Sequence, residues 1–203
     1  MCFQRCFFER SLAECMDSNT QNLIVAVLLG GLALHAQTFE LAPAEGARFA
    51  LEVYKTKLMA GKKHVFVFER YSGEATVDEV RFVVEAGSVN CTDTWVNEGS
   101  RKKIESAARD EVLQANRFPQ LVFASSKVVA KGADQYDVRG TLSIHGVPKP
   151  VTVQVTRKPD AFEGEATVKL SDYGIKPPSG PTFGLIGTKD EMKVLFRLIP
   201  KPR

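Results

Sequence analysis

Three side chains beyond residue 36 are of types that could carry out chemistry: His64, Cys91 and His145. Together they could form a three-ligand metal site, but zinc sites usually contain ligand pairs a few residues apart, and these three are far apart in the sequence. A cysteine with a histidine base could be a nucleophile, yet no oxyanion loop and no acidic partner is marked by spacing. We therefore predict a buried structural thiol for Cys91 and a turn-fixing hydrogen bond for His145. No catalytic residue, metal ligand or cofactor is predicted.

The composition is that of an ordinary folded domain. The 203 residues are 44% hydrophobic and 25% charged, with a net charge of +3 from 27 basic and 24 acidic residues. This excludes disordered and collagen-like classes. So small a net charge, without a basic cluster, predicts no nucleic-acid partner.

An uncharged apolar run, Leu23–Leu34, sets the N-terminal segment apart. As a helix it would reach about 18 Å at ~1.5 Å per residue, too short for a bilayer core of about 30 Å. It resembles the central region of a signal peptide, with cleavage after Ala36. We therefore expect residues 1–36 to direct export to the periplasm or outside the cell, and 37–203 to form the domain. A true start at Met16, or an apolar N-terminal element of the fold, remains open.

The rest of the chain reads as strands, because apolar and polar residues alternate with a period of two. Gly and Pro residues interrupt these runs at turns such as Lys131–Asp134 and His145–Pro148, and in a long connection from Ile175 to Lys189. We predict about eight antiparallel strands closed into a lipocalin-like β-barrel, since closure removes exposed edges. The predicted strand runs are 49–54, 64–69, 71–77, 80–85, 120–129, 136–144, 151–157, 162–170 and 192–199.

One helix is predicted between the strands. Ser100 is a candidate N-cap, and Ile104, Ala108, Val112 and Ala115 form a single apolar stripe after it. Pro119 ends the pattern. A helix with such a narrow stripe is expected to pack against a sheet or cover one end of a barrel.

Four segments, in order, resemble the YceI-like lipid-binding family. The hairpin GTLSIHGVPKPVTVQV (140–155) is similar to the recurring hairpin of that family, and RDEVLQANRFPQLVFASS (109–126) to its helix end and following strand. LSDYGI (170–175) and KDEMKVLFRL (189–198) resemble its late turn and its last strand. The resemblance implies an exported antiparallel barrel with a hydrophobic channel for a polyisoprenoid chain or a fatty-acid-like amphiphile, and no catalytic motif.

Apolar and aromatic side chains on the predicted strands and their borders are the candidate ligand contacts. Burial of an alkyl chain among them is worth about 0.8 kcal/mol per CH₂, so such a channel needs no charge to bind one. The candidates are Phe49, Leu51, Val53, Phe66, Phe68, Phe82, Val84, Trp95, Phe123, Ile144, Tyr173 and Phe183.

Several alternatives remain open at this point. The aromatic side chains could fill a solid core, in a cell-envelope module that binds a protein partner through its loops. A small metal-dependent enzyme is a second alternative. Trp95 could border the cavity or anchor a connection. A homodimer and transient contact with a membrane surface, through the basic Arg101–Lys103, are further expectations.

Overall fold

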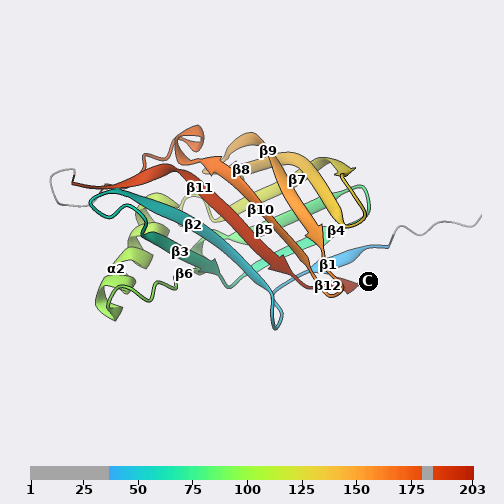
Figure 1. Cartoon of the computed structure of the whole chain (residues 1–203), viewed down its shortest axis with the longest axis horizontal. Helices are drawn as coiled ribbons and strands as arrows, with labels where there is room; N and C mark the ends of the chain where they lie inside the picture. Colours follow the sequence, from blue (N-terminus) through green and yellow to red (C-terminus); the bar gives the residue numbers. More distant parts are fainter. Residues whose placement is uncertain (1–36, 180–184) are drawn as a thin grey trace, which may run out of the picture. The chain divides into compact units, whose positions relative to one another are not determined.

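The alternating runs form one antiparallel sheet of twelve strands in the computed structural model, which describes residues 37–179 and 185–203 (Figure 1). The strands are β1 (Phe39–Leu41), β2 (Arg48–Lys57), β3 (Lys63–Phe68), β4 (Tyr71–Ala75), β5 (Val80–Glu85), β6 (Val89–Cys91), β7 (Gln120–Ala130), β8 (Gln135–Ile144), β9 (Val147–Arg157), β10 (Phe162–Lys169), β11 (Ile186–Leu198) and β12 (Pro200–Pro202). Their order in the sheet is β12-β1-β4-β5-β7-β8-β9-β10-β11-β2-β3-β6.

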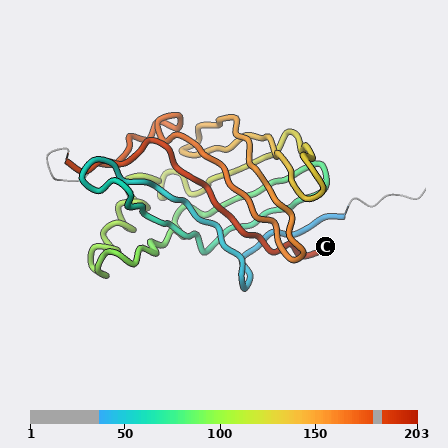
Figure 2. Tube along the Cα trace, in the orientation of Figure 1, coloured from blue at the N-terminus to red at the C-terminus, as the bar shows by residue number. Residues whose placement is uncertain are grey.

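The sheet is strongly curled and barrel-like. β12 follows β11 after the single residue Ile199, yet the two strands lie far apart in the sheet order because β12 pairs with β1. The sheet must therefore curl until β1 approaches the end of β11. The trace in Figure 2 follows this C-terminal segment along the curled sheet to the end of the chain.

The predicted number of about eight strands is wrong. Nine of the twelve strands overlap the predicted runs, and the three that were missed, β1, β6 and β12, have three residues each. Three residues are too few to show an alternating pattern. β12 also contains Pro200 and Pro202, which argue against a strand in sequence but are tolerated where no ladder N–H is needed.

The inserted helix is present, but it begins earlier than predicted. Helix α2 spans Glu98–Ala107 and its N-cap is Asn97, whose side-chain oxygen accepts the Ser100 N–H at 2.8 Å. Ser100 is thus inside the first turn, because asparagine is itself a strong N-cap. A π-helical turn, η2 (Ala108–Val112), continues the helix.

Helix α2 covers the edge of the sheet at β6, at the opposite end of the molecule from β1 and β12 (Figure 1). Glu105 of the helix accepts the backbone N–H of Cys91 at 3.0 Å, which satisfies a donor on this edge strand. Among the residues that the structure describes, no helix is long and apolar enough to cross a membrane.

The turns follow the chemistry that the sequence suggests. His145 and Gly146 have positive φ angles of 55° and 70° and form the two-residue turn between β8 and β9. β9 therefore begins at Val147, earlier than predicted. Similarly, β11 begins at Ile186, inside the predicted connection from Ile175 to Lys189.

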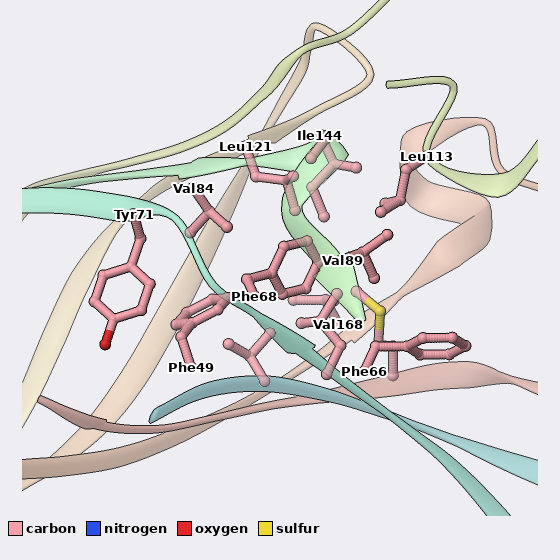
Figure 3. Close-up of a cluster of buried hydrophobic side chains, with 14 of the residues drawn as sticks. Phe49, Phe66, Phe68, Tyr71, Val84, Val89, Leu113, Leu121, Ile144 and Val168 are labelled. Atoms are coloured by element: carbon pink, nitrogen blue, oxygen red, sulfur yellow. The ribbon is translucent and has the colours of Figure 1, made fainter. Parts of the chain in front are cut away.

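A dense apolar core fills the interior at the α2 end of the sheet. Figure 3 shows Phe68, Val84, Leu121 and Ile144 directed toward one another from different strands. Phe68 and Ile144 are each only 1% exposed. The sheet interior is therefore closed at this end.

Candidate functional site: an apolar cavity inside the curled sheet

An apolar cavity of about 520 Å³ lies inside the curl of the sheet. Along each bordering strand it is every second side chain that faces the cavity, as the strand pleat requires. On β9 these are Val151, Val153 and Val155, and on the neighbouring β8 they include Tyr136 and Val138. The other apolar side chains of the lining come from all around the curl: Phe39, Leu41, Phe49, Leu51, Ala75, Val77, Val80, Phe82, Val84, Leu121, Phe123, Val128, Leu142, Ile144, Ala161, Phe162, Ala166, Met192, Val194, Phe196 and Leu198.

The cavity opens at the end of the sheet opposite α2. The exposed residues of its lining lie there, at Gln37, Val77 and Arg157–Asp160. Val77, in the turn between β4 and β5, is 66% exposed. The other end of the cavity is bordered by buried side chains such as Ile144. The site is thus a pocket with one described mouth and an apolar floor.

Glycines on the cavity face leave room for aromatic rings of the neighbouring strands. A Cβ atom at Gly140 would lie 2.7 Å from Cζ of Phe123, and one at Gly164 would lie 2.4 Å from Cζ of Phe196. Each ring therefore lies against the glycine of the adjacent strand, a recognised pairing in curved sheets. Because the two rings lie against these glycines, they leave more of the space inside the curl open.

Six of the twelve candidate ligand contacts are brought together around this cavity. They are Phe49, Leu51, Phe82, Val84, Phe123 and Ile144. Contact between these side chains and a ligand stays a prediction.

Five other candidates lie outside the cavity lining. Phe66 and Phe68 are buried in the core, and Val53 packs against that core. Tyr173 is 2% exposed in the short helix η3 (Leu170–Tyr173). Trp95 anchors the connection before α2, since its Nε1–H donates to the Lys63 carbonyl at 3.0 Å. Phe183, the twelfth candidate, lies outside the described residues.

Much of the lining was missed by sequence reasoning. Val153 and Val155 of β9 and Val194 and Phe196 of β11 belong to runs that were predicted as strands. The alternation of apolar and polar residues in these runs indicated that, within each strand, the apolar side chains share one face. Nothing in the pattern distinguished a face that borders open space from one that packs into a core.

His64 takes part in a buried polar pair near α2. Its Nδ1 contacts the carboxylate of Asp93, and the other oxygen of Asp93 accepts the Val65 N–H at 2.9 Å. The ring of Trp95 stacks on His64 with centroids 5.3 Å apart. Burial lowers the pKa of His64, although the hydrogen bond to Asp93 opposes this effect.

Cys91 and His145 are also embedded in packing. Burial raises the pKa of the Cys91 thiol to about 11, which disfavours the nucleophilic thiolate. The ring of His145 stacks on Phe118 at 4.8 Å, and the predicted turn-fixing hydrogen bond is not seen: its buried Nε2 finds no partner among the described residues. No three His, Cys, Asp or Glu side chains in residues 37–179 and 185–203 are grouped to hold a metal ion.

Residues 43–199 match the family model described as YceI-like domain. The chain is 29% identical over 124 residues to Protein YceI of Shigella flexneri, and 31% identical over 124 residues to a UPF0312 protein of Pseudomonas aeruginosa. Each match covers 56% of this chain and 64% of the relative, so the chain spans less than two thirds of these relatives.

Solved structures share the fold. BcnA of Burkholderia cenocepacia aligns with a TM-score of 0.56 at 20% identity, covering 74% of this chain and 95% of that protein. The YCEI protein of Campylobacter jejuni, described as crystallising with large solvent channels, aligns with a TM-score of 0.51 at 17% identity, covering 68% and 84%. The match over residues 43–199 confirms the resemblance suggested by the four segments, and the chain belongs to the YceI-like domain family.

Proposed function

We propose that this protein is an exported binding protein that holds a long apolar chain inside the curled sheet. The single observation that carries the proposal is the apolar cavity of about 520 Å³, a volume within the usual range of ligand sites. On this proposal the sheet works as a lipocalin-like barrel around its ligand. Binding is an equilibrium without chemical turnover.

The proposed ligand is a polyisoprenoid or a fatty-acid-like amphiphile. Each CH₂ group that leaves water for such a site contributes about 0.8 kcal/mol, so a chain of several such groups can bind with useful affinity. The valine and phenylalanine side chains of the lining would hold such a chain by shape and apolar contact, which suits an unbranched or regularly branched chain. The ligand would be carried, stored or sequestered in the periplasm or outside the cell, as the N-terminal segment suggests.

The cavity favours this proposal over an interaction module with a solid core. In a packed interior, voids larger than a water molecule are few, whereas this cavity is many times larger than one. A homodimer and contact with a membrane surface remain predictions from the sequence.

Native mass spectrometry of the full chain, purified from cells without added lipid, tests the proposal. We expect an additional mass of a few hundred daltons or more on part of the protein. Extraction with organic solvent should remove this mass, and incubation with a long-chain probe such as palmitic acid or farnesol should restore one. A protein that carries no ligand and takes up neither probe would refute the proposal.

A further inference from the structure

The mouth of the cavity carries two basic side chains, Arg157 and Lys158. Arg157 is the last residue of β9 and follows the cavity-facing Val151, Val153 and Val155 at the same two-residue spacing. Side chains at this spacing point to the same face of a strand. The guanidinium of Arg157 therefore ends the apolar row at the point where the cavity opens, and Lys158 is next to it in the turn to β10.

These two positive charges are not offset by acidic partners. Within the part of the chain that the structure describes, neither side chain forms an ion pair or a hydrogen bond. Asp160 is the acidic residue of the lining, and it already pairs with Arg197 at 2.7 Å. Asp78 and Glu79, in the turn between β4 and β5, do not contribute to the lining.

We propose that the ligand is an amphiphile with an anionic headgroup, a carboxylate or a phosphate, held at the mouth by Arg157 and Lys158 with its chain inward. This inference rests on the proposed function and specifies its ligand class. A guanidinium offers a planar fork of donors that matches both headgroups. An apolar cavity next to it excludes water from one side, so the attraction is screened less than between two fully exposed charges.

A displacement experiment separates the headgroup from the chain. The neutral dye Nile red is bound to the full-length protein and displaced by matched pairs that differ at the head: palmitate with palmitamide, and farnesyl phosphate with farnesol. We expect the anionic member of at least one pair to bind about tenfold more tightly at low salt, with the preference decreasing as salt is raised. The pair that shows the preference distinguishes a carboxylate from a phosphate ligand.

Variants locate the effect. In R157Q/K158Q the anionic and neutral members of each pair should bind with nearly equal affinity, so that the preference disappears. Arg139→Gln is the control for loss of positive charge elsewhere: Arg139 is exposed on the outer face of β8, so this substitution removes a charge without touching the cavity. This variant should keep the preference.

The outcomes distinguish this inference from the proposed function. Equal binding of charged and neutral members by the wild type, or a preference that survives in R157Q/K158Q, would overturn the headgroup assignment and leave the cavity as a site for chains. Failure of all four compounds to displace the dye would instead contradict the proposed function itself.

Discussion

Filling the cavity from one strand should weaken ligand binding strongly without harming the fold. Val153 lies in the middle of β9 opposite Val138 of β8, and both side chains line the cavity. A phenylalanine at position 153 brings about four more carbon atoms into this space. If each excludes one CH₂ of the ligand, binding loses about 3 kcal/mol, or about 200-fold in Kd.

Thr152→Phe provides the matched control. Thr152 is the preceding residue of the same strand and is exposed on the outer face of the sheet, outside the cavity lining. The Thr152→Phe substitution introduces the same ring into the same strand, so any general effect of phenylalanine on β9 appears in both variants.

Calorimetric titration with palmitamide measures the affinity, and thermal unfolding followed by circular dichroism measures stability. We expect Val153→Phe to lose binding while its Tm stays near that of the wild type, because the ring enters space that is already open. Thr152→Phe should bind as the wild type does. If Val153→Phe binds normally while folded, the ligand does not occupy this cavity and the reasoning from its lining is wrong.

Three further predictions concern residues that shape or surround the cavity. Gly140→Ala should lower the free energy of unfolding in urea by about 1–3 kcal/mol, because its Cβ would collide with the backbone oxygen of Ala124 and the ring of Phe123. Gly132→Ala, with open space around it, should change little, and equal effects would contradict the close-packing argument. Because burial lowers the pKa of His64, its imidazole binds a proton more readily in the unfolded chain than in the folded protein, and stability should fall as pH drops below about 6.5. The urea midpoint of His64→Gln should fall less than that of the wild type over this range. Equal falls in the two proteins would contradict this prediction. Cys91, with its thiol pKa raised to about 11, should react with Ellman's reagent at neutral pH only after denaturation, so rapid reaction of the folded protein would show that the thiol is accessible.

Local pattern was sufficient for the type and position of most elements. Alternation predicted the nine longer strands, and the Gly and Pro residues within 145–148 predicted the tight turn between β8 and β9. It failed for the strands of three residues and displaced the N-cap from Asn97 to Ser100, because two good capping residues lie close together there. The strand number was wrong because a strand of three residues is defined by its partners in the sheet and has no periodicity of its own.

The candidate site was only partly accessible to sequence reasoning. The pairs Phe66–Phe68 and Phe82–Val84 show the same alternation and all four side chains are buried in the core, yet only the second pair also lines the cavity. The distinction depends on how far the sheet curls at each strand, which is set by pairings between residues distant in the chain.

The sequence by itself determined that the chain is an antiparallel β protein, because period-two alternation and turn residues are local properties of the chain. The YceI-like family was indicated separately, by four short segments that resemble it. Tertiary structure alone decided where open space remains. The lining is assembled from strands that meet only through the curl, the ring of Phe123 is placed by a glycine on a different strand, and Arg157 reaches the mouth only because β9 ends there. A cavity is a property of the gaps between elements, and no single segment carries that information.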